Sequence, residues 1–231
     1  MIFFISPPFG NYLNLPNTIP IKGSYTLYPR PGLIGQIFKT LRYSFEYGGW
    51  INKIGLRNKG LDYAIKNYSH NHIVSIAILN SEQIDIINNK IPDNMNIEIN
   101  VSCPNINKKL ISDGISVFLN DKRKWCIVKL SPTTDTKLID SYYKKGFRQF
   151  HCSNTLPIKN GGLSGPILKK YNLTLIKYIK NKYPNTTIIA GGGIRNIKDI
   201  QYYKNIGADH FSVSTLAFNP LLFCYFYFNY L

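Results

Sequence analysis

The sequence predicts an α/β fold in which a parallel sheet closes into a (β/α)8 barrel. Eight short runs rich in Ile, Val and Phe recur along the chain, and segments of helical or loop character separate them. Several runs are almost continuously apolar, as parallel strands buried on both faces are. An open, doubly wound sheet is the alternative, but eight strand–helix alternations favour the barrel. No linker or repeat interrupts the pattern, so we expect one compact domain over residues 1–231.

The predicted strands are short and occur throughout the chain. They cover residues 2–6, 18–26, 72–79, 96–103, 125–131, 147–153, 186–191 and 210–216. Only about a dozen residues, Pro16 among them, separate the first two strands. We therefore expect a shortened first crossover without a full helix.

Four of the intervening segments have the apolar spacing of helices. They cover residues 81–90, 134–145, 172–183 and 196–206. Asn196 stands at an N-cap position, Gly207 follows the last helical residue, and Pro184 ends the helix before the seventh strand. These signals place each helix between two strands, as a barrel requires.

Composition and charge exclude several classes of protein. The chain is 44% hydrophobic and 17% charged, which allows a large core and excludes a disordered chain. Lys and Arg total 28 and Asp and Glu 12, so the formal net charge is +16. An anionic partner would explain this charge, but the lysines are scattered. We attribute the charge to compositional bias and do not expect nucleic-acid binding.

The cysteines and the ends of the chain bear on compartment and partners. The four cysteines form neither a disulfide framework nor a C-x-x-C zinc motif, so no metal is expected. Residues 1–8 lack the basic segment of a signal peptide, and the apolar stretch 218–231 is too short to span a bilayer. We expect a cytoplasmic protein without a membrane anchor. The apolar face of residues 218–231 would pack on the barrel or on a second copy of the chain, as in a homodimer.

Polar residues gather where the predicted strands end, which is where barrel enzymes carry their active sites. Asn100, Cys103 and Asn105 lie at the end of the fourth strand and just after it. Amide side chains bind polar heterocycles or carboxylates, and a thiol on a loop can act as a base or nucleophile. A buried cysteine beside ordinary turn residues is the alternative interpretation.

Two further strand ends carry polar side chains. Ser153, Asn154 and Thr155 lie at the end of the sixth strand. We expect His151, just before them, to have a packing role, because no carboxylate partner is evident near it in the sequence. Lys129 lies in the apolar fifth strand, where a lysine is costly unless it is paired. A negative or electron-rich ligand would explain it, and a strand-edge lysine that reaches solvent is the alternative.

Glycines and hydroxyl residues follow the last strands, at 161–166, 191–195 and 214–215. Backbone N–H groups of glycines at a helix start bind phosphate well. Barrel phosphate sites often use the loops after strands seven and eight. Three such clusters at these strand ends predict a phosphate-bearing cofactor.

Together these motifs resemble those of the dihydroorotate dehydrogenase family of FMN-dependent TIM barrels, nearest to its soluble class with a cysteine base. The resemblance covers most of the chain. It rests on NxxGLxNxGLDY at 52–63, EINVSCPN at 98–105, VKLSP at 128–132, SNT at 153–155, GGLSG at 161–165, GGGI at 191–194 and ST at 214–215. The order of these motifs and their strand positions follow the family.

The resemblance implies a set of cofactor and substrate contacts. The FMN phosphate would be held by Ser164, Gly165, Gly192, Gly193, Ser214 and Thr215. The flavin ring would contact Gly23, Ser24, Asn100 and Lys129. Lys129 would stabilise negative charge on the reduced ring. A small pyrimidine substrate would be held by Asn52, Asn100, Asn105, Asn154 and Thr155, and by the backbone of Gly55 and Leu56.

The implied reaction is the oxidation of dihydroorotate to orotate in pyrimidine biosynthesis. Cys103 would take a proton from C5 of the substrate while hydride passes from C6 to flavin N5. In one class of the family a second lysine precedes the serine of the second strand, where this chain has Gly23. Lys22 is one residue away and would face the opposite side of the strand, which leaves its role undecided.

Two alternatives remain open. A related FMN barrel with another substrate, such as a tRNA dihydrouridine synthase, would suit the positive charge. That class lacks the SCPN–SNT pairing, and 231 residues leave no room for its RNA-binding domain. A barrel that keeps the FMN or pyrimidine pocket without catalysis would suit the displaced lysine. The electron acceptor is also undecided among fumarate, a quinone and a partner subunit.

Overall fold

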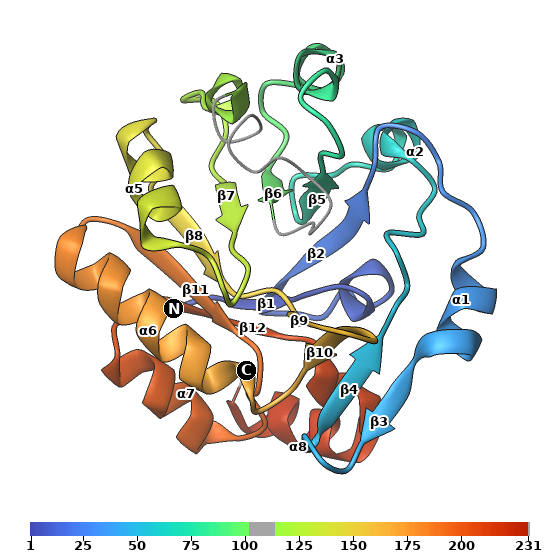
Figure 1. Ribbon diagram of the computed structural model, residues 1–231, viewed down its shortest axis with the longest axis vertical. Helices are drawn as coiled ribbons and strands as arrows, with labels where there is room; N and C mark the ends of the chain where they lie inside the picture. The colour runs from blue at the N-terminus through green and yellow to red at the C-terminus, as the bar shows by residue number, and fades with distance from the viewer. Residues whose placement is uncertain (102–113, 231) are drawn as a thin grey trace.

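The computed structural model describes residues 1–101 and 114–230 and confirms the predicted closed barrel (Figure 1). The parallel strands are β1 (Phe3–Ile5), β2 (Thr18–Tyr25), β5 (Ile73–Ala77), β6 (Ile97–Asn100), β7 (Cys126–Lys129), β8 (Gln149–Cys152), β11 (Thr187–Gly191) and β12 (His210–Val213). They follow one another around the barrel in this order, and β12 pairs with β1 to close it. Each predicted strand segment contains one of these strands.

Helices cover the outside of the barrel (Figure 1). They are α2 (Leu61–Lys66), α3 (Gln83–Lys90), α5 (Thr136–Lys144), α6 (Leu168–Lys182), α7 (Ile197–Asn205) and α8 (Pro220–Tyr230), with 3-10 turns η2 (Ile115–Phe118) and η3 (Thr215–Phe218). The four predicted helices correspond to α3, α5, α6 and α7. The side chain of Asn196 caps α7 by accepting from the Asp199 N–H at 3.2 Å, and Gly207 beyond its end has φ +106°.

The first crossover is short, as expected. Between β1 and β2 the chain forms only a 3-10 turn, η1 (Phe9–Asn11), which packs on the barrel instead of a full helix. At the other end of the chain, Phe223 and Phe226 of α8 are buried against the barrel, while Leu221 and Phe228 are exposed. In the part of the chain that the structure describes, no helix is both long and apolar enough to cross a bilayer.

A second, antiparallel sheet was not predicted. It has the order β3-β4-β10-β9 and contains β3 (Arg42–Ser44), β4 (Gly49–Asn52), β10 (Gly161–Ser164) and β9 (Leu156–Ile158). A short helix, α1 (Leu33–Thr40), precedes it. Strands of three or four residues carry little periodicity, and β4 and β10 lie more than a hundred residues apart in sequence. Because β9 and β10 directly follow β8, the small sheet stands at the carboxyl ends of the barrel strands.

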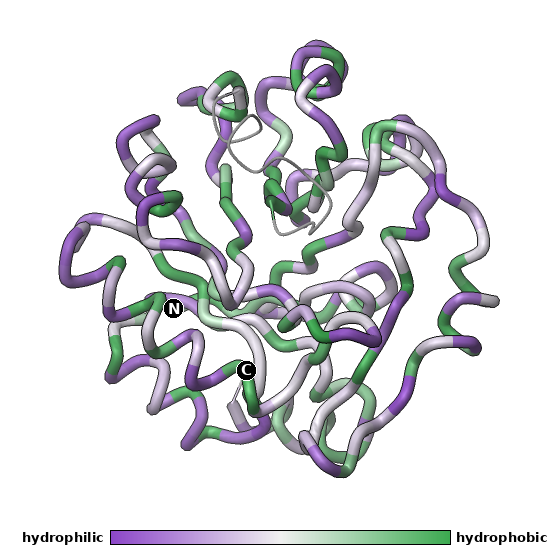
Figure 2. Tube along the Cα trace, viewed as in Figure 1, coloured by the Kyte–Doolittle hydropathy of each residue, from purple (hydrophilic) through white to green (hydrophobic). Residues whose placement is uncertain are grey.

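The hydrophobic core has two parts. The larger one lies between the barrel strands and the surrounding helices, and the smaller one fills the barrel interior with Phe4, Ile21, Ile73, Trp125, Ile127 and Ile189. Figure 2 shows hydrophobic residues along the strands and hydrophilic residues on the outer turns of the helices. This apolar layer, against which the His210 ring also packs, closes the amino-terminal end of the barrel, so the cavity lies at the other end.

A buried histidine outside the barrel makes stability depend on pH. His72 is 2% exposed, and burial, with a smaller effect of Lys22, lowers its pKa from 6.5 to about 4. Below pH 6.5 the unfolded chain binds a proton that the folded protein resists, so stability falls as the pH drops towards 4. We expect this residue to account for a loss of about 3 kcal/mol. Urea unfolding of wild type and His72→Asn at pH 7 and pH 4.5 tests this: an equal loss in both proteins would refute it.

Candidate active site

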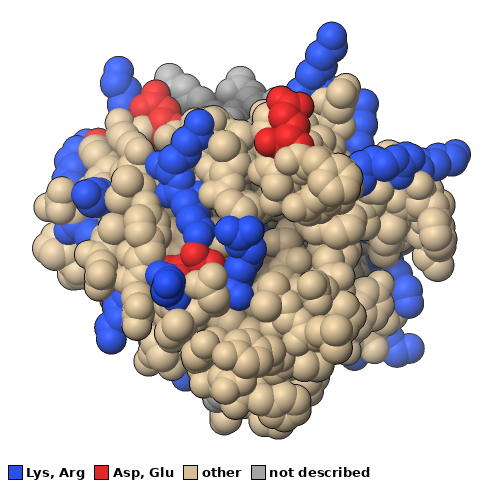
Figure 3. All heavy atoms as spheres, turned by 90° about the horizontal axis from the view of Figure 1, so that it is seen from below, with Lys and Arg blue, Asp and Glu red and all other residues tan. Residues whose placement is uncertain are grey.

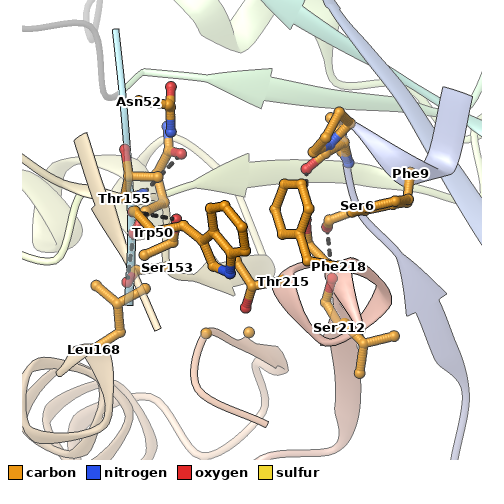
Figure 4. A pocket seen from close by; sticks show the side chains of 18 of the residues that line it. Ser6, Phe9, Trp50, Asn52, Ser153, Thr155, Leu168, Ser212, Thr215 and Phe218 are labelled. Atoms are coloured by element: carbon orange, nitrogen blue, oxygen red, sulfur yellow. Dashed lines mark hydrogen bonds between the residues drawn. The ribbon is translucent and has the colours of Figure 1, made fainter. Parts of the chain in front are cut away.

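A cavity of about 270 Å³ opens at the carboxyl ends of the barrel strands, beneath the small sheet (Figure 4). The predicted residues that line it are Asn52, Lys129, Asn154, Thr155, Ser164, Gly192, Gly193, Ser214 and Thr215. They come from β4, β7, β10 and the segments that follow β8, β11 and β12. The structure therefore brings together residues that are up to 163 positions apart (215 − 52).

The other predicted residues are placed elsewhere. Gly23, Ser24, Gly55, Leu56, Asn100 and Gly165 are not part of the cavity wall. Ser24 and Asn100 join it through hydrogen bonds described below, and Gly165 lies directly behind Gly193. Cys103 and Asn105 lie outside the described residues.

Lys22 does not line this cavity. Its neighbour Ile21 belongs to the apolar cluster inside the barrel, so Lys22 points outward, where it lines a separate polar recess with Tyr63 and His72. Position 23 is held by Asn11, whose Oδ1 accepts from the Gly23 N–H at 2.8 Å. Among the described residues, Lys129 is the lysine that lines the cavity.

The cavity floor carries a buried charged cluster. The Lys129 ammonium lies 3.4 Å from Glu98 Oε1, and the Nδ1–H of His151 donates to Glu98 Oε2 at 2.6 Å. Glu98 is fully buried and Lys129 is 8% exposed, so this lysine does not reach solvent. The expectation that His151 has no carboxylate partner is wrong, because Glu98 lies 53 residues away on β6, two strands from β8. Lys129 thus has a protein counterion as well as a face towards the cavity.

The protonation states of the cluster follow from its geometry. Burial alone would raise the pKa of Glu98, but Lys129 and His151 outweigh it and lower that pKa to about 2. Burial lowers the pKa of His151, and Lys129 adds to this against the opposing effect of Glu98. At neutral pH the cluster therefore holds one carboxylate, one ammonium and one neutral imidazole, with no net charge.

A chain of hydrogen bonds connects this floor to the cavity wall. Ser75 Oγ donates to Glu98 Oε1 at 2.8 Å and lies 2.9 Å from Ser24 Oγ. Asn100 Nδ2 donates to Ser24 Oγ at 3.0 Å, and Asn154 Nδ2 donates to Asn100 Oδ1 at 3.2 Å. The amides of β6 and of the segment after β8 are therefore oriented by the same network that holds the charged floor.

The glycine segment after β11 forms another wall. Asn172 on α6 donates to the Gly191 carbonyl at 2.7 Å, and Tyr203 on α7 donates to the Gly192 carbonyl at 2.6 Å. Gly193 has φ +78°, and a Cβ there would lie 2.9 Å from Pro166 Cα. Both carbonyls are bonded to helices behind the cavity, and only glycine fits where the two glycine segments touch. A cradle of this kind suits a phosphate group.

Aromatic residues that sequence reasoning missed complete the cavity. Trp50 of β4 and Phe218 of η3 stack with ring centroids 4.3 Å apart, and Phe9 packs edge-on against Phe218 at 4.9 Å. In Figure 4 the Trp50 side chain lies between Asn52 and Thr155 on one side and the Ser6–Ser212 pair on the other. These rings offer a flat apolar surface to a planar ligand.

Of the missed residues, Glu98 had a recognisable signal. It stands between Ile97 and Ile99 in a buried strand, where an acid is as costly as Lys129 is in the next strand. Two opposite charges on neighbouring buried strands indicate a pair. Trp50 and Phe218 carried no such signal, because aromatic residues are frequent throughout the chain.

The arrangement fits a planar, phosphate-bearing cofactor. Glycine backbone N–H groups and the Thr215 hydroxyl supply donors at one wall, where the Ser164 and Ser214 hydroxyls donate to the carbonyls of Trp50 and Pro7. A buried cation lies at the floor, and aromatic rings supply a flat surface. Such a site can stabilise negative charge that develops on a bound ring above Lys129.

The chain is similar to curated bacterial proteins, although no protein-family model matches it. These proteins are named dihydroorotate dehydrogenase B (NAD(+)), catalytic subunit. Identity to the Desulforamulus reducens protein is 30%, over 90% of this chain and 78% of that protein. Identity to the Bacteroides thetaiotaomicron protein is 31%, over 74% and 67%. Identity to the Thermotoga petrophila protein is 27%, over 91% and 87%.

A solved structure shares the fold. The dihydroorotate dehydrogenase from Eimeria tenella, crystallised in complex with ferulenol, superposes with a TM-score of 0.63 over 84% of this chain and 68% of that one. Sequence identity in that comparison is 18%, so this likeness concerns the fold alone.

Proposed function

Because this chain belongs to the dihydroorotate dehydrogenase family, we propose that it uses FMN to oxidise dihydroorotate to orotate in pyrimidine biosynthesis. One observation carries the proposal: a buried ammonium, Lys129, at the floor of a cavity whose wall is a glycine cradle. A flavin oxidoreductase requires both a site for the cofactor's phosphate and a cation that stabilises negative charge on the reduced flavin ring.

FMN would bind with its phosphate at Ser164, Gly165, Gly192, Gly193, Ser214 and Thr215. When bound, it supplies the acceptor for the hydride that leaves the substrate. Lys129 would approach the ring from the floor, and Ser24 and Asn100 would act from the hydrogen-bond network beside it. Gly23 would let the backbone come close to the ring.

The substrate would be a small pyrimidine held by amide and hydroxyl groups. Asn52, Asn154 and Thr155 line the cavity, and Asn100 holds the Asn154 amide in one orientation at 3.2 Å. Asn105 would add a fourth amide, and the backbone of Gly55 and Leu56 would bind the carboxylate. Cys103 would remove the proton from C5, a role that rests on the sequence motif.

We propose a single-domain cytoplasmic protein that forms a homodimer and acts on a small molecule. Figure 3 shows one face of the protein, on which Lys and Arg side chains are spread from edge to edge, with several gathered around an acidic residue near the centre. This dispersion supports compositional bias over nucleic-acid binding as the origin of the positive charge.

A second candidate function has one specific observation in its favour. Lys22 faces away from the cavity, so among the described residues Lys129 alone supplies a lysine there. A barrel that binds FMN or a pyrimidine without oxidising it would need no second lysine.

The visible absorption spectrum, taken before and after anaerobic addition of dihydroorotate, separates these candidates. We expect the purified protein to be yellow and to bleach. A yellow protein that stays yellow would favour the binding function. A colourless protein that takes up no FMN would overturn both.

Cofactor binding should also change the fluorescence of the protein. The chain has two tryptophans, and of these Trp50 lines the cavity while Trp125 lies in the apolar layer inside the barrel. We expect FMN added to cofactor-free protein to quench most of the Trp50 emission. The measurement is a titration of wild type, Trp50→Phe and Trp125→Phe. Equal quenching in both variants would contradict this location of the cofactor.

A further inference from the structure

His151 is an unusual residue for the floor of such a cavity. Its ring is 1% exposed yet lines the cavity, and its Nδ1–H is committed to Glu98 at 2.6 Å. The opposite ring nitrogen, Nε2, points to Gly191 of the neighbouring strand β11. A Cβ at position 191 would lie 2.6 Å from it, so only glycine leaves room for the ring. The imidazole is thus held rigidly with one lone pair directed to the cavity wall.

The charges at the floor balance only in one redox state. The charges of Glu98 and Lys129 cancel, and His151 is neutral. The cavity floor together with an oxidised, uncharged flavin ring therefore carries no net charge. Reduction by a hydride would add two electrons and one proton to a bound, uncharged flavin ring and would therefore leave it with one negative charge. A net charge in a buried site is strongly unfavourable unless it is compensated.

We propose that His151 takes up one proton at Nε2 when the bound flavin is reduced, and so keeps the cavity floor neutral. This inference rests on the proposed function as far as the identity of the cofactor is concerned. The proton comes from solvent in the cavity and forms the Nε2–H bond, while the Nδ1–H bond to Glu98 stays intact. The hydride accounts for both electrons, so no other oxidant or reductant takes part.

The groups around the imidazole support this assignment. Glu98 faces it from β6, the charge of Lys129 acts on it from β7, and the non-titrating Gly191 faces it from β11. The remaining titratable residue of the cavity wall, among those described, is Tyr12, which is 73% exposed at the rim. In the protein without a charged ligand, burial and Lys129 lower the pKa of His151 against the opposing effect of Glu98. A negative charge nearby favours the imidazolium, so the proton is gained on reduction and lost on oxidation.

The midpoint potential of bound FMN, measured between pH 6 and pH 9 by chemical reduction, tests the proposal. The matched variant is His151→Asn, whose amide can still donate to Glu98 but cannot take up a proton. The control is His72→Asn, which removes a buried histidine far from the cavity. We expect two protons per two electrons in wild type and in His72→Asn, and one in His151→Asn. The potential of His151→Asn would therefore fall half as steeply with pH.

A second measurement does not depend on the variant folding. The ¹⁵N chemical shifts of His151 in wild type should report a neutral ring in the cofactor-free and oxidised protein and an imidazolium in the reduced protein. The same slope in wild type and His151→Asn, or a neutral ring after reduction, would overturn the proposal.

The two proposals fail in different ways. Because the reductant is chemical, loss of dihydroorotate oxidation alone would overturn the proposed activity and leave the role of His151 standing. A protein that binds no FMN would overturn both.

Discussion

Replacing Lys129 by methionine should lower the free energy of unfolding by about 3–5 kcal/mol, because it leaves a buried carboxylate without its cation. Glu98 has no solvent exposure and depends on Lys129 and His151 to stay ionised. In the variant its pKa should rise, since burial then acts with less opposition. The measurement is chemical denaturation at pH 7, read by circular dichroism.

A double variant separates the lost charge from the lost packing. In Lys129→Met with Glu98→Gln, both partners are neutral and of similar size, so most of the stability should return. If the double variant is as unstable as Lys129→Met, the ion pair is not the cause. The double variant should still bind FMN at the glycine cradle, but dihydroorotate should reduce it more slowly, because the Lys129 ammonium no longer stabilises the charge gained by the ring.

The barrel could be predicted from the sequence because its signals are local. Runs such as 72–79 and 186–191 are apolar throughout, and Asn196 and Gly207 mark the two ends of a helix. Each signal depends on neighbouring residues only, and eight repeats of the pattern leave few topologies. The short first crossover was predictable for the same reason, from the number of residues available.

The parts that sequence reasoning missed depend on pairings between distant residues. β4 pairs with β10, and Trp50 stacks on Phe218, across more than a hundred residues in each case. His151 was interpreted without Glu98 because the partner lies two strands away in the barrel, not nearby in sequence. The strand ends predicted which residues would gather at the cavity, whereas the charged floor that orients them required the closed barrel.

Replacing Cys103 by alanine should slow the reduction of bound FMN by dihydroorotate about 10²–10⁴-fold, the usual contribution of a positioned base. FMN binding should be unchanged, because the proposed phosphate contacts belong to other parts of the chain. Anaerobic stopped-flow absorbance measures the rate, and the flavin spectrum reports the cofactor content. Cys224→Ala is the matched control, since that thiol is exposed on α8.

The rate of flavin reduction should also depend on pH in a direction that identifies Cys103 as the base. A base acts when it is deprotonated, so the wild-type rate should rise with pH until the thiol is ionised, near pH 8.5 for an unperturbed cysteine. In Cys103→Ser the rate should keep rising to higher pH, because a hydroxyl is a much weaker acid than a thiol. If Cys103→Ala keeps the wild-type rate and profile, another group removes the C5 proton. In that case the likeness of the EINVSCPN motif to its family would extend to binding and not to catalysis.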